Sequence, residues 1–255
     1  MHMRLLGQVW PPEPKLTIPR LGFSWQEGNT ERVDTISVKI TDSVVEIDCD
    51  VPDFDLNDNE HLGKIVGHVT LTAQGAASLA TFISGNAFYV RLECIVTDDG
   101  IVHPFQVNNP SVVGLCTSVG FDQTFSATMV DITPEPLILH AMSDLTAAIA
   151  QPHYALVACA RAVEAIRHVL AGPDADPGSV GWPAVRSALN ADRPYLELIT
   201  RASIRPRHGE RMHRDIDTDE NEVIRRAWTL MDRLLHYRKR GNVDLTEPDF
   251  PLLRG

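Results

Sequence analysis

The residues best suited to chemistry lie between Thr200 and Asp215, in the sequence TRASIRPRHGERMHRD. Five guanidinium groups in sixteen residues repel one another unless an anion or acidic side chains offset their charge. A histidine titrates near neutral pH and can carry a proton, while an arginine can hold phosphoryl oxygens. The stretch therefore predicts a site that binds a phosphate and moves a proton. Its candidate residues are Arg201, Arg205, Arg207, His208, Arg211, His213 and Arg214.

Two possible metal sites in the sequence lack the required spacing. His208 and His213 are five positions apart, so they do not share a helical face, and HExxH is absent. Residues 53–60 are acidic like a calcium loop, but Asp58 stands where the sharp turn needs glycine. Lys64 also stands where a bidentate glutamate would close such a loop. We therefore expect no metal ion and no cofactor.

The charge of the chain is unevenly distributed. The formal net charge is −11, and residues 1–135 carry 7 Lys and Arg against 18 Asp and Glu. Residues 136–255 carry 16 of each sign, and within residues 201–240 the balance is 11 basic against 7 acidic. A local positive region thus lies in the neutral half of an acidic protein, and such a region can bind a polyanion, although the acidic half would repel it.

The length of 255 residues and an apolar content of 44% fit a folded protein with one large or two ordinary domains. Four isolated cysteines without a CxxC motif predict buried thiols in a reducing compartment. The N-terminus does not resemble a signal peptide, and no apolar run reaches about 18 residues. We therefore expect a cytoplasmic protein without membrane contact.

The N-terminal half has the alternating pattern of antiparallel strands. Residues 4–10 predict a strand, and the prolines that follow it favour a sheet edge. Residues 34–48 predict a hairpin that turns at Asp42 and Ser43. A second hairpin is predicted around Asp98-Asp99-Gly100, which supplies the positive φ of a tight turn. Between and after them we expect a strand at 64–72, a helix at 73–85 and mostly strand at 108–133.

After Pro134 and Pro136 the apolar period changes from two to 3.6 residues, which predicts helices. We expect helices at 137–150, 152–170, 182–190, after a cap at Asp192, and at 221–237. On the last helix, Arg225, Arg226, Asp232 and Arg233 are predicted to face water. The fold class is thus α+β, with a β-rich domain over 1–135, a helical bundle over 136–241 and a tail over 242–255.

The helical half resembles the HEPN domains, helical bundles of many prokaryotic defence and toxin–antitoxin proteins. The resemblance covers residues 137–240 and rests on the helix YALVACARAVEAIRHVL, an Arg and His pair, and a closing amphipathic helix. The family motif is an Arg followed by a His, with four to six residues between them, the first of which is usually polar. Arg207 with His213 fits it, and Arg201 with His208 fits except for Ala202. Pro206 departs from the family, so a helix must end near Ser203 or begin anew at Pro206.

The resemblance implies RNA cleavage without metal, in which a 2′-hydroxyl attacks the adjacent phosphate. His208 or His213 would then transfer the proton, Arg207 would hold the phosphate, and Arg201 would assist. Arg205, Arg211 and Arg214 would bind the nucleic acid, and two chains would form a homodimer through their helical halves. Two other readings stay open. The bundle could bind nucleic acid, a nucleotide or a protein without cleaving it, or the charges could form only a surface mesh of ion pairs.

Overall fold

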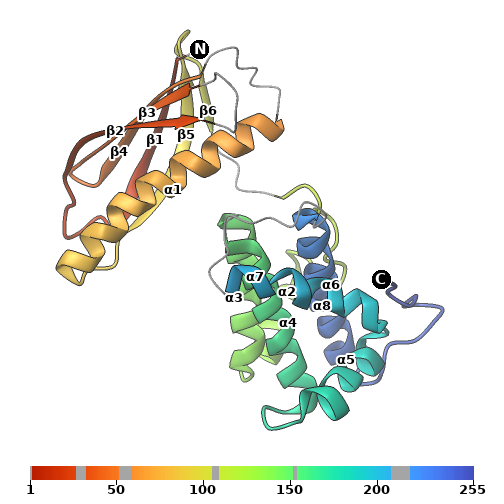
Figure 1. Ribbon diagram of the computed structural model, residues 1–255. Coiled ribbons are helices and arrows are strands. Elements are labelled where there is room, and N and C mark those ends of the chain that lie inside the picture. Colours follow the sequence, from red (N-terminus) through yellow and green to blue (C-terminus); the bar gives the residue numbers. More distant parts are fainter. Residues whose placement is uncertain (1, 27–32, 52–58, 105–108, 152–153, 208–218) are drawn as a thin grey trace. The chain divides into compact units, whose positions relative to one another are not determined.

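The computed structural model describes residues 2–26, 33–51, 59–104, 109–151, 154–207 and 219–255. The chain divides into two compact units, Met1–Gln106 and Val107–Gly255, called here the sheet unit and the helical unit (Figure 1). The predicted α+β class is confirmed. The division between the units precedes the change of sequence period at Pro134 and Pro136, because residues 109–132 already belong to the helical unit.

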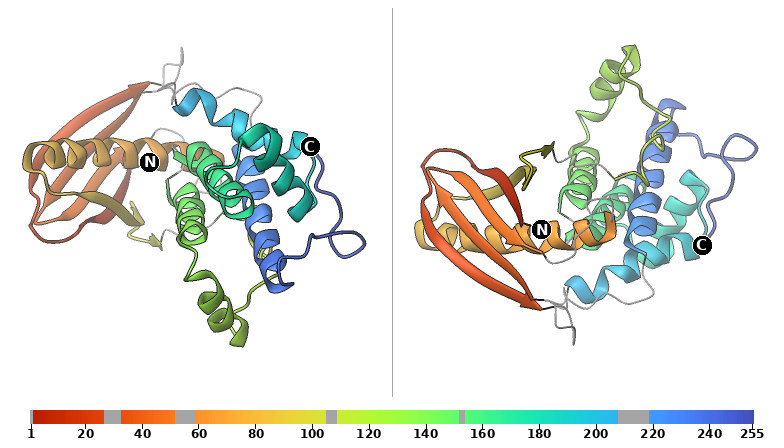
Figure 2. Two further views of the ribbon diagram at one scale, coloured as in Figure 1. Left: turned by 90° about the horizontal axis from the view of Figure 1, so that it is seen from below. Right: turned by 90° about the horizontal axis from the view of Figure 1, so that it is seen from above.

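The sheet unit is a six-stranded antiparallel sheet with the order β2-β3-β4-β1-β5-β6. Helix α1 lies along one face of this sheet (Figures 1 and 2). Buried side chains alternate with exposed ones along β1 and β4, as expected when only one face meets the core. The elements are β1 (His2–Trp10), β2 (Ile18–Gln26), β3 (Val33–Thr41), β4 (Val44–Asp50), α1 (Asn59–Ser84), β5 (Tyr89–Thr97) and β6 (Val102–Pro104).

The predicted edge position of the first strand is wrong, since β1 lies between β4 and β5. The prolines do not interrupt its ladder because they begin only after Trp10. The chain beyond them is held by Ser43, whose Oγ donates to Pro12 and accepts from the Leu16 amide. The edge strands are instead β6 and β2, and β2 was not predicted from the sequence.

Both predicted hairpins are confirmed. β3 and β4 are joined by Asp42 and Ser43, with φ of 50° and 69°, as a two-residue turn with two positive φ values requires. β5 and β6 are joined through Gly100, with φ of 78°. Turn residues that tolerate positive φ thus fixed both connections.

The predicted strand at 64–72 is wrong, because these residues belong to α1. The run is rich in β-branched residues, which favours strands locally. The buried residues of this run, however, are four positions apart, and the same spacing continues into the helix predicted at 73–85. Only a helix places residues at this spacing on one face. They are Ile65, Val69, Ala73 and Ala77. None of the helices in the described residues combines the length and hydropathy that a membrane crossing needs.

A β-bulge shapes the centre of the sheet. β5 contains an extra residue, Glu93, where its register against β1 shifts next to Gly7. Leu92 and Ile95 therefore both face the core although they are three positions apart. A Cβ at Gly7 would lie 2.2 Å from the carbonyl oxygen of Arg91, so this position requires glycine.

The helical unit is built on α3, α4 and α8, which pack against one another (Figure 1). The predicted helices of this half are confirmed, whereas the predicted strand at 108–133 is wrong. Helix α2 occupies ten residues near the end of that range, and its N-cap is Asp122, which accepts from the Thr124 amide. The elements are α2 (Gln123–Ile132), α3 (Pro136–Ala150), α4 (Ala155–Ala171), the π-helix η2 (Pro177–Gly181), α5 (Trp182–Leu189), α6 (Arg193–Ala202), α7 (Ile204–Arg207) and α8 (Glu220–Lys239).

Asp232 and Arg233 of α8 are buried, contrary to the prediction that they face water. The Asp232 carboxylate accepts from the amides of Thr117 and Ser118, at 2.9 and 2.8 Å, and from the Thr117 hydroxyl. Burial raises the pKa of Asp232, but the hydrogen bonds from Ser118 and Thr117 outweigh it and lower the pKa below 3.8. The carboxylate therefore fastens the loop before α2 to α8.

Arg233 fastens the C-terminal residues in the same way. Its guanidinium donates to the carbonyl oxygens of Leu189 at 2.7 Å, Asn190 at 3.0 Å and Pro251 at 2.5 Å. The first two carbonyls lie at the C-terminal end of α5, where a cation is favourable. The predicted tail thus packs on the bundle, and Leu245 within it is buried.

We predict that Gly7→Ala lowers the free energy of unfolding of the sheet unit by about 2 kcal/mol, because its Cβ meets the backbone of β5. Urea denaturation followed by far-UV circular dichroism measures the change. Gly22→Ala in β2 is the matched control, since a Cβ there meets no atom within 4 Å. Equal stability of the two variants would contradict the bulge geometry.

We predict that Asp232→Asn destabilises the helical unit by about 2 kcal/mol at pH 6 through weaker hydrogen bonds. Because the pKa of Asp232 is lower in the folded protein than its ordinary value of 3.8, the carboxylate stabilises the fold at pH values above 3.8. This stabilisation is lost as the pH falls below 3.8 and through the lowered pKa. The difference between wild type and variant should therefore shrink at pH 3. Denaturation at both pH values tests this, with the exposed Asp249→Asn as control. A difference independent of pH would rule out the charge as its cause.

Candidate functional site

The stretch from Thr200 to Asp215 is called here the basic stretch. Its described part lies on α6 and α7. Asp192 caps α6 by accepting from the Tyr195 amide at 2.8 Å, as predicted. The helix ends at Ala202, and α7 follows after the buried Ser203. The chain therefore breaks its helix before Pro206, as the sequence requires. Three of the predicted site residues are exposed here, namely Arg201, Arg205 and Arg207.

Glu197 partly neutralises the start of this surface. Its carboxylate accepts from Arg193 Nε at 2.7 Å and lies 3.4 Å from Arg201 Nη2. The hydrogen bond from Arg193 is the main cause that lowers the pKa of Glu197. The Arg201 side chain nevertheless remains 72% exposed, so an exposed pair in water holds it only weakly.

The other predicted site residues lie outside the described residues. These are His208, Arg211, His213 and Arg214. The structure thus brings Arg201, Arg205 and Arg207 onto one short stretch of surface. Their arrangement with the histidines stays a prediction.

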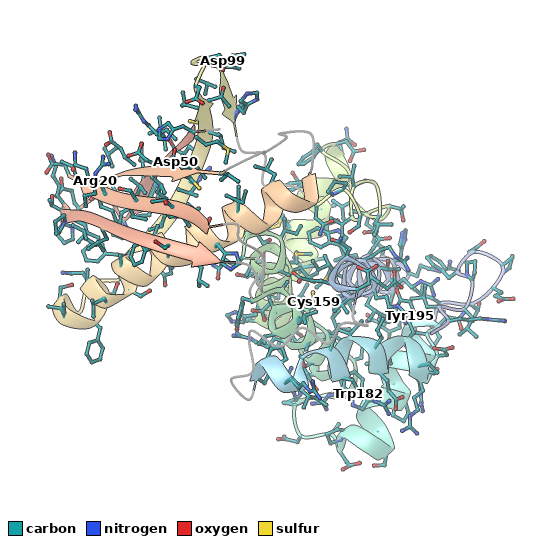
Figure 3. All side chains as sticks on the ribbon, turned by 45° about the horizontal axis from the view of Figure 1, so that its top comes forward. Arg20, Asp50, Asp99, Cys159, Trp182 and Tyr195 are labelled. Carbon is teal, nitrogen blue, oxygen red and sulfur yellow. The ribbon has the colours of Figure 1, made fainter. Side chains whose placement is uncertain are left out.

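The two arginines at the start of α8 have internal partners. Glu222 accepts from Arg225 Nε at 2.7 Å and from Arg226 Nε at 2.6 Å. The Arg226 guanidinium also lies 4.7 Å from the centre of the Tyr195 ring, a cation–π contact between α8 and α6 (Tyr195 is labelled in Figure 3). Arg226 therefore contributes to the packing of α6 on α8, and Glu222 offsets the charge of both arginines.

The sequence analysis missed a buried polar cluster at the end of α4. Arg167 donates to Glu164 at 2.9 Å and contacts His168 Nε2 at 3.0 Å, and its guanidinium lies 5.6 Å from the Trp182 ring centre (Trp182 is labelled in Figure 3). A Cβ at Gly181 would lie 2.9 Å from Arg167 Nη1, so the π-helix packs directly on the guanidinium. The three-residue spacing of Glu164 and Arg167 could have predicted their ion pair from the sequence. The contact of Arg167 with Trp182 could not be predicted, because it depends on the tertiary fold.

The four cysteines are free thiols. Cys49 and Cys159 are buried as predicted, whereas Cys116 is exposed. Burial raises the pKa of Cys159 to about 12, and this residue lies inside the helical unit (Figure 3). Its thiol is therefore a packing group rather than a nucleophile. Among the described residues no three His, Cys, Asp or Glu side chains are grouped to hold a metal ion.

One model of a known domain family matches the helical unit. Residues 126–239 match the C-terminal domain of DUF8168, a domain of unknown function. The DUF8168 match begins within α2 and ends at the last residue of α8, so it covers the helical bundle and the whole basic stretch. No curated protein and no solved structure matches the chain. The HEPN resemblance of the matched residues therefore remains a hypothesis.

Proposed function

We propose that the helical unit binds RNA through residues 201–214, here called the basic segment, and cleaves it without a metal ion. One observation supports this proposal most directly. Arg201, Arg205 and Arg207 are all exposed over seven residues at the junction of α6 and α7. Exposed guanidinium groups at this spacing attract a chain of phosphates, because each fork can donate two hydrogen bonds to phosphate oxygens.

The surrounding charges support binding at this segment rather than elsewhere on the bundle. The arginines of early α8 are offset by Glu222, and Arg233 is occupied by backbone carbonyl oxygens. Arg201 is the first residue of the basic segment. Its described partner is Glu197, which also pairs with Arg193. The exposed arginines of residues 201–207 are therefore better placed to meet a ligand than Arg225, Arg226 and Arg233 are.

The cleavage step in this proposal is a transesterification. The 2′-hydroxyl of a ribose loses its proton to a histidine, His208 or His213, and its oxygen attacks the adjacent phosphorus. The bond to the 5′-oxygen breaks, and that oxygen takes a proton, leaving a 2′,3′-cyclic phosphate and a 5′-hydroxyl. Arg207 stabilises the negative charge that builds on the phosphoryl oxygens. The proposal follows from the residue types and from the HEPN resemblance.

We predict that the purified chain cleaves single-stranded or structured RNA in the presence of EDTA, with a rate that peaks near neutral pH. His208→Ala or His213→Ala should lower the rate by roughly 10² or more, depending on which histidine transfers the proton. Arg207→Ala should cause a comparable loss. Gel analysis of end-labelled RNA measures the rates and identifies the cyclic phosphate.

Arg240→Ala provides the control for these variants. It removes an exposed arginine from the other end of α8, a helix about 30 Å long. Cleavage that survives in the His208→Ala, His213→Ala double variant would come from a contaminating nuclease. RNA that is bound with a steep salt dependence but left intact would assign the unit to binding alone.

We predict that Glu197→Gln increases RNA affinity a few-fold at low salt, because it releases Arg193 and Arg201 from their shared partner. The gain should shrink as salt screens the charges. Fluorescence anisotropy with a labelled RNA measures both effects. Glu247→Gln changes the net charge equally at an exposed position of the C-terminal residues and should give a smaller gain. Equal gains would mean that RNA responds only to net charge.

A further inference from the structure

The side of α1 that faces away from the sheet is uncharged and apolar. The only charged residues of this helix, Glu60 and Lys64, lie near its beginning, and residues 65–84 contain no Asp, Glu, Lys or Arg. We call its exposed positions the outward face: Gly67, Leu71, Gly75, Ser78, Leu79, Phe82 and Ile83. Their large side chains project strongly, since Leu79 is 61%, Phe82 87% and Ile83 77% exposed. Solvent-facing helix surfaces are normally rich in charged and polar residues.

The outward face alternates small and large residues at four-residue steps. Gly67, Leu71, Gly75, Leu79 and Ile83 form one row along the helix, about 24 Å long at 1.5 Å per residue. Rows at this spacing are the ridges that fit between the ridges of another helix. A Cβ at Gly67 or Gly75 would meet no atom of the chain within 4 Å. These glycines therefore do not serve packing inside the sheet unit, and they leave notches in the row.

The rest of the sheet unit is strongly charged. Residues 1–106 carry 7 basic against 15 acidic side chains. On the sheet face opposite α1, Asp48 lies 3.0 Å from Arg20 and 3.5 Å from Arg4 (Arg20 is labelled in Figure 3). Two copies of such an acidic unit repel each other over most of their surface. They can meet without bringing carboxylates together only where charges are absent.

We propose that the outward face of α1 binds the outward face of a second copy of this chain. The two helices cross with a two-fold axis near Gly75, which permits the closest approach because it has no Cβ. Around this axis Leu71 of one copy faces Leu79 of the other. A two-fold contact requires a self-complementary surface, and a row of notches and ridges centred on a glycine has this property.

The absence of charge also argues for a second copy rather than a charged partner. A nucleic acid or a basic or acidic peptide would be recognised by complementary charges, and residues 65–84 offer none. A surface identical to the outward face matches it both in shape and in lack of charge. This contact is separate from the basic segment and independent of RNA cleavage.

Analytical ultracentrifugation of the full chain between about 1 and 100 µM, on the order of typical weak dimer affinities, tests the proposal. We expect a reversible dimer for the wild type. Leu79→Glu should weaken it roughly 100-fold or more, because each dimer would bury two unpartnered carboxylates. Gly75→Ala should weaken it roughly tenfold by separating the helices, although alanine favours the helix itself.

Val102→Glu is the matched control. It introduces the same charge in the same unit at a side chain of similar exposure, 58%, on strand β6. It should leave the dimer intact. A wild type that is monomeric at about 100 µM, a dimer insensitive to Leu79→Glu and Gly75→Ala, or equal disruption by Val102→Glu would each overturn the proposal. Circular dichroism verifies folding, and if Leu79→Glu misfolds then Gly75→Ala decides the outcome.

Discussion

Two adjacent buried charges on α8 hold the helical unit together. Asp232 and Arg233 point in different directions because consecutive helical residues are about 100° apart. The carboxylate accepts hydrogen bonds from the amides of residues 117 and 118, and the guanidinium donates to carbonyl oxygens of α5 and of the C-terminal residues. Backbone groups supply most of the hydrogen bonds to each charge, and such bonds offset the desolvation cost of a buried ion. The irregular segments of the unit thus depend on one turn of one helix.

The elements that the sequence predicted best are those with local causes. The hairpin at Asp42 and Ser43, the cap at Asp192 and the period of α3 and α4 all follow from a few neighbouring residues. The helix at 64–72 was missed because β-branched composition competes with a buried step that is visible only over the whole of α1. The central position of β1 was missed because strand order depends on pairing with β5, more than eighty residues later. Asp232 and Arg233 were placed in water since charge usually indicates exposure.

The candidate site was predictable in residue type but only partly in environment. The sequence marked Arg201, Arg205 and Arg207, and all three are exposed on the two short helices that flank Ser203. The spacing of Glu222 with Arg225 and Arg226, three and four residues, could have excluded these arginines from the site. The Arg167 and Trp182 contact could not be predicted, because it forms only when the π-helix folds back onto α4.

The bulge beside Gly7 also limits how this sequence can diverge. Glycine at position 7 and the extra residue Glu93 in β5 are needed together, because deleting the extra residue would restore a regular ladder and make room for a side chain. Evolution can therefore change the two sites jointly more easily than either one alone. The family match begins at residue 126 and does not reach this sheet. Homologues of the sheet unit, whatever domain follows them, should be recognisable by a glycine in the first strand paired with a lengthened fifth strand.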